Sequence, residues 1–452
     1  MKNIIKIAVI TLMFFGTFSC SDDFVDLAPI TYANEADFYK TDGDFEAAIV
    51  SVYAGFRSSP GTRIPFNMEY RADNLKFNNY TYQELSTNLL GANTGSFLWG
   101  TYSSLIYPAN NILDRLEVTE GISSSVKDVV SGEALFFRGY AYYWLTLGFG
   151  KVPLVTSVIT SDEALELGLS SEDEVLAQAV ADFQKAASLL PPTSSVFGKL
   201  DKYDAMAFQA KALMLQNNWS AAVPVLQEIY NNSGHQLEPV WTDMWTTAAE
   251  KTSKEFMFQV INSELANNNS FAQQLLYIRG DNTTQEVFMY KSGLFESFED
   301  GDIRRDETLG FDIDGIAENR KYDFGQVGNI WTQDIQVLRF TEIQLLYAEA
   351  ISMAVNSVQQ QSLDLINEIR NRAGLDDLEM ADVPNMDAFV EAVLAERRAE
   401  FVFEGKRYAD LKRHNLLVSK LNAIGYSFDD SYNYLPIPQN EKDKVPDGLY
   451  DN

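Results

Sequence analysis

The feature that most constrains this fold lies near the C-terminus, in residues 386–414. Its large apolar side chains recur at spacings of three, four and seven, which places them on one face of a helix: Val390, Leu394, Phe401, Tyr408 and Leu411. The remaining positions are densely charged. This pattern predicts one amphipathic helix that packs against the protein core.

Two residues on the predicted apolar face are unusual there. Gly405 costs a helix roughly 1 kcal/mol relative to alanine, so its presence indicates a close approach by another part of the backbone. Arg397 needs a carboxylate partner among large apolar neighbours, and Glu400 and Glu404 lie within one helical turn. We therefore expect other segments of the chain to assemble on this helix.

The composition argues against several classes of protein. A formal net charge of -29, from 64 acidic and 35 basic residues in 452, disfavours nucleic-acid binding and adhesion to anionic lipid. The single cysteine leaves no disulfide within the chain. The two histidines, His235 and His414, leave little material for histidine-based catalysis or metal binding. A chain of this length buries a large core in one or two domains.

The N-terminus has the pattern of a secretory signal. Lys2 and Lys6 precede an uncharged run that ends at Cys20 and is too short to span a bilayer, which takes about twenty residues. The residues before Cys20 resemble the lipobox of bacterial lipoproteins. We predict a lipoprotein signal peptide at residues 1–19, lipidation of Cys20, and a lipid anchor and tether at residues 20–40. The alternative is an unmodified cysteine beside an ordinary cleavage site.

Helical periodicity dominates the rest of the chain, so we predict a predominantly α-helical domain over residues 41–452. Helical patterns occupy residues 45–56, 99–116, 126–147, 172–190, 203–216, 220–230, 342–354 and 362–372. Small residues such as Ala207 and Ala222 stand where neighbouring helices would cross, as in tetratricopeptide (TPR) repeats, although the repeat consensus is absent. Five tryptophans on or beside helical stripes are assigned to the core: Trp99, Trp144, Trp219, Trp241 and Trp245.

We therefore predict an all-α fold with TPR-like helix pairs near residues 133–230 and 338–372. Residues 253–337 form a predicted irregular insertion with a few short strands, at 256–261 and 286–290. No long linker is expected. The Asp312-Ile-Asp-Gly315 run lacks the remaining ligands of a calcium loop, so we interpret it as a turn and predict no metal site.

Five segments of this chain resemble one family, in the order expected for it. The stretch Glu396-Arg-Arg-x-Glu-Phe-x-Phe-Glu-Gly-x-Arg-x-x-Asp-Leu-x-Arg413 is similar to the C-terminal hallmark of SusD/RagB-type proteins, the outer-surface glycan-binding lipoproteins of Bacteroidetes-type bacteria. The other four segments are residues 99–110, Glu133-x-x-x-x-Arg138 leading to Gly150-Lys-Val-Pro153, residues 338–350, and Tyr434-Leu-Pro-Ile-Pro-Gln-Asn-Glu441. Together with Cys20, the resemblance runs from residue 20 to residue 441.

The aperiodic residues 58–96 are where we expect a ligand to bind. A neutral sugar needs flat aromatic faces for its C–H bonds and amide or carboxylate groups for its hydroxyls. Each aromatic contact contributes on the order of 1 kcal/mol, so several must act together. The loop at 66–82 has this mixture, and a second group surrounds Trp331 in the insertion. The predicted glycan contacts are Asp73, Asn74, Phe77, Asn78, Tyr80, Tyr82, Tyr290 and Trp331, although each aromatic among them could instead pack in the core.

The resemblance implies a lipid-anchored protein on the surface of the outer membrane. Such a protein binds an oligosaccharide or polysaccharide and delivers it to a SusC-type TonB-dependent transporter, with no cofactor and no covalent chemistry. Capture of peptide or another nutrient stays open, as do a peptide-binding scaffold and a lipid-anchored glycoside hydrolase. The sequence has no nucleophile elbow, P-loop or H-E-x-x-H motif, but its many carboxylates allow acid pairs.

Overall fold

The computed structural model describes residues 38–77, 84–85, 87–246, 248–262, 287–289, 293–311, 317–322, 326–327, 330–331 and 333–451. The predicted signal peptide, Cys20 and nearly all of the predicted tether lie outside these residues. The Asp312–Gly315 run also lies outside them, whereas residues 309–311 before it and 317–319 after it are described.

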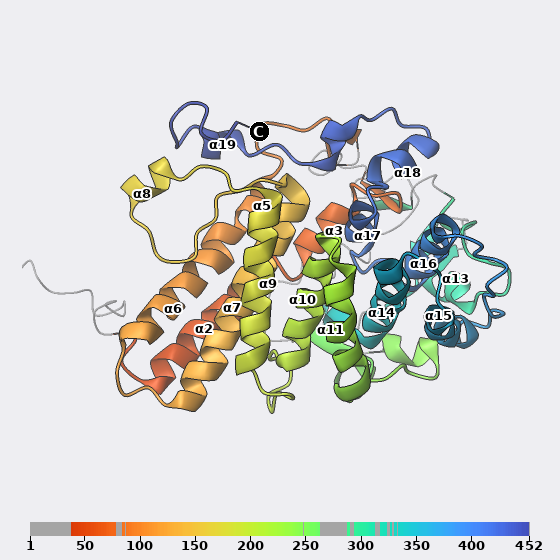
Figure 1. Cartoon of the computed structure of the whole chain (residues 1–452), viewed down its shortest axis with the longest axis horizontal. Helices are drawn as coiled ribbons and strands as arrows, with labels where there is room; N and C mark the ends of the chain where they lie inside the picture. Colours follow the sequence, from red (N-terminus) through yellow and green to blue (C-terminus); the bar gives the residue numbers. More distant parts are fainter. Residues whose placement is uncertain are drawn as a thin grey trace, which may run out of the picture.

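A row of long helices forms the body of the protein (Figure 1). Along the row, α7 packs on α9, and each later helix packs on the next in the order α10, α11, α14 and α15, while α2 and α6 cover α7. This arrangement confirms the predominantly helical, TPR-like fold. The long helices are α2 (Asp42–Ser58), α6 (Tyr107–Val118), α7 (Ser124–Phe149), α9 (Glu172–Leu189), α10 (Lys202–Leu215), α11 (Trp219–Asn232), α14 (Phe340–Val355), α15 (Gln360–Arg372) and α16 (Met386–Glu400).

Local sequence explains where these helices begin and how they pack. The side chains of Thr41, Ser171 and Asp201 cap α2, α9 and α10, each in a reciprocal capping box with the third residue of the helix. Ala207 and Ala222 are fully buried on α10 and α11, as the predicted helix crossing requires. Small side chains at this crossing let the two backbones approach closely.

Short elements connect and cover the row. The short helices are α3 (Arg63–Glu69), α5 (Ser96–Trp99), α8 (Ser161–Glu166), α13 (Ile303–Thr308), α17 (Arg407–Arg413), α18 (Leu417–Ala423) and α19 (Gln439–Lys442). A π-helical turn, Tyr102–Ile106, runs directly into α6, and 3-10 turns occupy Trp241–Trp245, Ala249–Lys251 and Asp430–Asn433.

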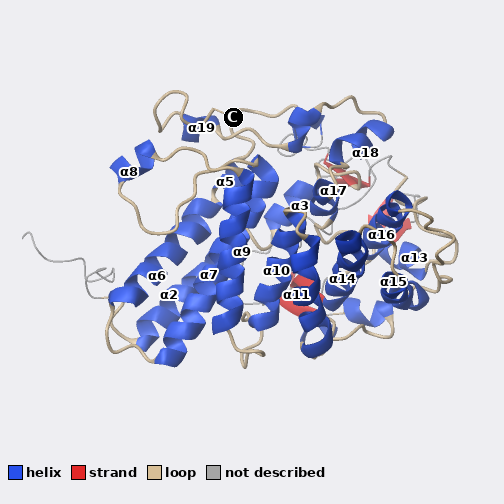
Figure 2. Ribbon diagram, viewed as in Figure 1, coloured by secondary structure: helices blue, strands red, loops and turns tan. Residues whose placement is uncertain are grey.

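Within the described residues, the strands form four separate antiparallel pairs. Strands are coloured red in Figure 2. They are β1 (Leu75–Phe77) with β3 (Val287–Met289), β2 (Phe256–Val260) with β8 (Ile335–Arg339), β4 (Leu309–Phe311) with β5 (Ala317–Asn319), and β6 (Gln326–Val327) with β7 (Ile330–Trp331). β2 and β3 confirm the two strands predicted from the sequence. The β2–β8 pair joins the two ends of the insertion, so the insertion leaves and re-enters the helical row at one place.

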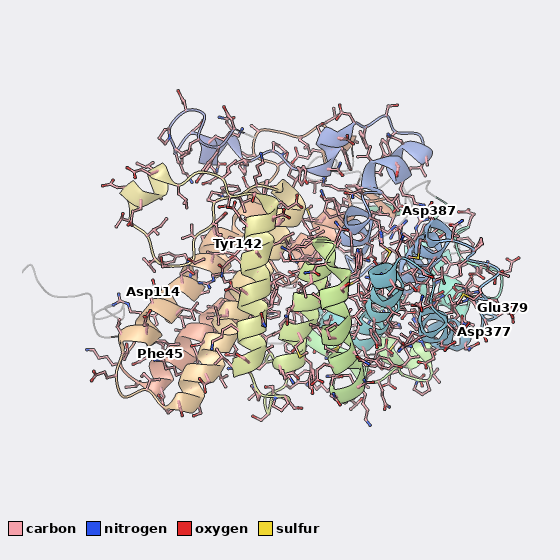
Figure 3. All side chains as sticks on the ribbon, viewed as in Figure 1. Phe45, Asp114, Tyr142, Asp377, Glu379 and Asp387 are labelled. Carbon is pink, nitrogen blue, oxygen red and sulfur yellow. The ribbon has the colours of Figure 1, made fainter. Side chains whose placement is uncertain are left out.

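One continuous apolar core fills the space between these elements. All five tryptophans assigned to it are buried, as predicted. Figure 3 labels Phe45 on α2 and Tyr142 on α7, both fully buried. At the end of the molecule away from Phe45, the same view labels three exposed acidic residues, Asp377, Glu379 and Asp387.

Residues 386–414 do not form the single helix predicted for them. α16 ends at Glu400, and α17 begins only at Arg407. Between them Phe403 and Gly405 have φ of 65° and 69°, a left-handed conformation that no right-handed helix contains. The inferred close approach at Gly405 is confirmed, because a Cβ there would lie 2.8 Å from the carbonyl carbon of Pro65.

Residues 58–96 contain more regular structure than their lack of periodicity indicated. α3 lies within them, and its Phe66, with the following Tyr70, is 2% exposed. These two aromatic residues of the predicted ligand loop therefore pack in the core. The seven-residue helix is too short for a period to show in the sequence.

Candidate functional site

Two buried polar residues, Asp73 and Asn74, hold the predicted ligand loop in place just before β1. Asp73 accepts two hydrogen bonds from the guanidinium of Arg407, from Nε at 2.7 Å and from Nη2 at 2.9 Å. The amide of Asn74 donates to Glu69 at 3.0 Å and accepts from Nε of Arg398 at 2.7 Å. Asp73 and Asn74 are only 4% and 2% exposed. The prediction that they contact a glycan is corrected here, because internal partners use their polar atoms.

The charges of Asp73 and Glu69 are set by burial and pairing. Burial raises the pKa of Asp73, but the charge and hydrogen bonds of Arg407, together with the charge of Arg398, outweigh that effect and lower the pKa to about 2. Burial raises the pKa of Glu69 to about 7 against the hydrogen bonds from Asn74 and from the Arg407 amide. Asp73 is therefore ionised at neutral pH and holds the start of β1 against α17.

Strand pairing brings two of the predicted ligand segments together. β1 and β3 are antiparallel, with Leu75 opposite Met289 and Phe77 opposite Val287. Paired strands lie about 4.8 Å apart, so residues 75–77 and 287–289 are neighbours although the sequence separates them widely. We call the β1–β3 pair with the segments that extend from it the loop face.

The structure leaves Asn78 and all five aromatic candidates untested. Asn78, Tyr80, Tyr82 and Tyr290 lie outside the described residues. The backbones of Phe77 and Trp331 are described as parts of β1 and β7, but their side chains are not. Trp331 stands opposite Gln326, and among the described strands the β6–β7 pair is joined to neither β1 nor β3.

A second group of charges, the charged junction, lies inside the molecule where α16 and α17 meet the insertion and the helical row. Glu400 accepts hydrogen bonds from Arg304 at 3.0 Å, Arg339 at 3.1 Å and Arg372 at 2.7 Å. Glu404 accepts two from Arg339, at 2.9 and 2.8 Å. The other members of the junction are Glu255, Asp302, Lys321 and Glu396.

Arg397 has a carboxylate partner, as predicted, but not the predicted one. Its Nη2 lies 2.8 Å from Asp410 on α17 and 3.8 Å from Glu342 on α14. Glu400 and Glu404 belong to the charged junction instead. The break at Gly405 turns α17 so that Asp410 reaches Arg397, and a continuous helix would not bring these two side chains together.

The geometry favours a structural role for these carboxylates. Burial raises the pKa of Glu400, but the charges of Arg372, Arg339 and Arg304 outweigh it and hold the pKa well below its usual range. An acid fixed in its ionised form cannot donate a proton near neutral pH. In the part of the chain that the structure describes, no group of three or more His, Cys, Asp or Glu side chains is placed to hold a metal ion.

A surface pocket of about 770 Å³ lies next to the base of the ligand loop. Its walls are residues 88–90, the end of α7 with the first turn of α9, and the segment 431–436. Two motifs from the sequence meet there, Gly150-Lys and Tyr434-Leu-Pro. Sequence analysis missed this pocket, because neither turn has a pattern that shows which distant segment it faces.

The comparisons with known proteins agree with this architecture. A family model described as the SusD family matches residues 315–452, and one described as "Starch-binding associating with outer membrane" matches residues 31–214. The chain belongs to the SusD/RagB-type family. The Arg397–Asp410 pair lies within the residues that the C-terminal family model matches, as do Glu400 and Glu404 of the charged junction.

Individual relatives of this SusD/RagB-type chain are distant. "SusD-like protein P2" of Formosa agariphila is 23% identical, over 93% of each chain. Among solved structures, a SusD superfamily protein of Bacteroides vulgatus has a TM-score of 0.74 at 23% identity, covering 92% of this chain and 99% of that one. Surface glycan-binding protein A of Bacteroides thetaiotaomicron, solved in complex with laminarihexaose, has a TM-score of 0.73 at 21% identity, covering 91% and 99%. These matches establish the fold.

Within the described ranges, no helix is both long enough and apolar enough to cross a bilayer.

Proposed function

We propose that this protein binds a glycan at the surface of the outer membrane and delivers it to a SusC-type TonB-dependent transporter. The observation that carries the proposal is the β1–β3 pair, because β1 leads into the segment with most of the candidate sugar contacts and β3 leads into Tyr290. Two comparisons support it. Surface glycan-binding protein A, which shares the fold, holds laminarihexaose, and the N-terminal family model is described as starch-binding and associating with the outer membrane.

The proposed contacts are Phe77, Asn78, Tyr80, Tyr82 and Tyr290, with Trp331 as a further contact from the separate β6–β7 pair. The first five belong to the loop face, where the Asp73–Arg407 pair fixes the start of β1. A fixed base reduces the conformational entropy that binding must overcome. Aromatic faces supply the apolar contacts and Asn78 supplies hydrogen bonds to hydroxyls. Specificity then depends on loop residues, while the helical row acts as a rigid support.

Attachment to the membrane is proposed through acylation of Cys20. Each buried methylene contributes about 0.8 kcal/mol, so a multiply acylated cysteine gives a stable anchor. A Cys20→Ala variant should leave the membrane fraction and appear in soluble form, whereas Ser21→Ala should stay membrane-bound. Retention of Cys20→Ala on the membrane contradicts the anchor.

The binding proposal is tested by isothermal titration of residues 21–452 against plant, microbial and host polysaccharides, laminarin and starch included. We expect binding to at least one glycan without release of reducing ends. Tyr80→Ala and Trp331→Ala should each weaken that binding about tenfold, which is about 1.4 kcal/mol. Tyr107→Ala is the matched control, because Tyr107 is an exposed aromatic on α6, away from the loop face.

Other outcomes identify the alternatives. Binding of peptides with no glycan bound would keep nutrient capture and change the cargo. Hydrolysis of any panel member would establish a glycoside hydrolase and overturn the non-enzymatic proposal. For delivery, the full-length chain should co-purify with a TonB-dependent transporter from its native outer membranes, and isolation of the chain alone in mild detergent contradicts this step.

A further inference from the structure

The pocket beside the loop base has the features of a preformed ligand site. Its walls are tied together by hydrogen bonds between distant segments: the Leu435 amide donates to Gly148 at 2.6 Å, and the Tyr432 hydroxyl donates to Leu85 at 3.3 Å. A volume of about 770 Å³ is within the range of small-molecule sites, roughly 300–1,000 Å³. Because the walls are already linked, a ligand would not have to assemble them.

One wall of the pocket is held rigidly by Tyr434. Its hydroxyl donates to Glu172 at 2.9 Å, and its ring lies against Gly150, where a Cβ would be 2.9 Å from the ring. Gly150 has a φ of 71°, so both the backbone conformation and the close packing require glycine. With Leu90 and Pro436, this wall gives the pocket an apolar surface beside its polar groups.

Three polar side chains of the pocket have no ion pair or side-chain hydrogen bond within the described residues. The Oδ1 atom of Asn88 is buried without a hydrogen-bond partner. Lys151 and Asp173 are exposed on the two sides of the α7–α9 junction. A buried amide oxygen without a partner costs free energy, so Asn88 indicates a ligand or water that donates to it.

We propose that this pocket is a second sugar-binding subsite, which takes hydroxyl-rich, uncharged residues of the same glycan chain that binds at the loop face. The inference rests on the proposed function and adds a second contact region to it. Each sugar hydroxyl both donates and accepts, and Lys151 offers donors, Asp173 acceptors and Asn88 both. With Glu172 and Asp173 beside a single lysine, the pocket disfavours a polyanionic glycan.

A hydrogen bond and the chain itself link the pocket to the loop face. Tyr432, just inside the pocket wall, donates its hydroxyl to the carbonyl of Arg71 at 3.1 Å, and Arg71 lies two residues before Asp73. The segment that follows the ligand loop then supplies Asn88 and Leu90. A chain long enough to span both regions gains from both sets of contacts, whereas a short one occupies a single region.

The test compares glycans of different length on pocket variants of residues 21–452. The probes are laminaribiose, laminarihexaose and laminarin, or the matching series of whichever panel glycan binds. Lys151→Ala combined with Asp173→Asn should weaken binding of the polysaccharide about tenfold and leave the disaccharide bound at the loop face unchanged. Asn88→Gly should act in the same direction, and glycine tolerates the φ of 56° found at Asn88. Lys185→Ala, an exposed lysine on α9 outside the pocket, is the control.

Chemical labelling gives a second measurement on the unaltered protein. Saturating polysaccharide should reduce acylation of Lys151, measured by mass spectrometry, and leave Lys185 unaffected. The wild-type chain and all pocket variants could bind the polysaccharide with equal affinity, with Lys151 unprotected. That result overturns the second subsite and leaves the proposed function in place. Failure of the wild-type chain to bind any glycan of the panel overturns both.

Discussion

The charged junction and the loop face use their residues in opposite ways. In the junction, Arg304, Arg339 and Arg372 converge on Glu400, all four side chains are nearly or fully buried, and every contact is internal. The loop face has a short, fixed base from which its candidate contacts extend. The junction determines how the chain folds, and the loop face is proposed to determine what it binds.

This difference explains why family membership is easier to infer than the ligand. Many of the residues in 396–413, which resemble the SusD/RagB hallmark, are buried between α16, α17 and their partners. Removing one partner of a buried ion pair leaves an uncompensated charge, so these positions depend closely on one another. No motif of the sequence determines which aromatic residues of the loop face contact a ligand, so the ligand must be measured.

The largest expected effect is at the centre of the junction. Glu400→Gln removes the charge that balances three guanidinium groups, and loss of one member of a buried pair typically costs about 3–5 kcal/mol. Urea unfolding should show this loss of stability. Glu391→Gln is the control, because Glu391 is exposed and pairs with Lys420 at the surface. Equal stability of the two variants would show that the junction contributes little.

A smaller effect is expected where α16 turns into α17. Gly405→Ala places a Cβ 2.8 Å from Pro65 in a left-handed conformation, whereas Gly121→Ala, with a φ of 82°, meets nothing within 4 Å. Both variants bear the conformational cost of about 1–2 kcal/mol, and Gly405→Ala should lose about 1–3 kcal/mol more through overpacking. Thermal denaturation of the two variants measures the cost of the close approach as the difference between their losses of stability. Equal losses would contradict a tight contact between Gly405 and Pro65.

The smallest stability effect concerns the base of the loop face and depends on pH. The pKa of Asp73 is lowered from 3.8 to about 2, so its pairing stabilises the fold above pH 4 and is lost as pH falls toward 2. A shift of this size corresponds to about 2 kcal/mol. The stability advantage of the wild-type chain over Asp73→Asn should shrink by about that amount between pH 5 and pH 2. An advantage independent of pH would contradict the pairing with Arg407.

Much of the scaffold could be predicted from the sequence because its signals are local. The helical periods at residues 126–147 and 172–190 and the small residues at the α10–α11 crossing are each visible within a few residues of sequence. The break inside residues 386–414 could not be predicted, since the apolar spacing continues across it. A glycine at position 405 is equally compatible with a close contact along a continuous helix. The partner of Arg397 follows from that break, so it was missed as well.

The candidate site was predictable only in part, for a related reason. Asp73 and Asn74 have the chemistry of sugar contacts, and only the fold reveals that Arg407 and Arg398 already occupy them. The pairing of β1 with β3 joins segments far apart in the sequence, and no local pattern encodes it. The sequence placed Tyr290 in the second group, with Trp331, whereas the strand pairing sets the segment before Tyr290 beside β1. The contacts of all these residues with a glycan stay a prediction.

The most direct test of the central claim measures unfolding and glycan binding on the same variants. Tyr80→Ala and Trp331→Ala should lose about tenfold in affinity for the best glycan of the panel, about 1.4 kcal/mol, while their urea midpoints stay at the wild-type value. Glu400→Gln should do the reverse, with a lowered midpoint and wild-type affinity in its folded fraction. Unchanged affinity in both aromatic variants, or their unfolding at the midpoint of Glu400→Gln, would contradict the separation of scaffold and loop face.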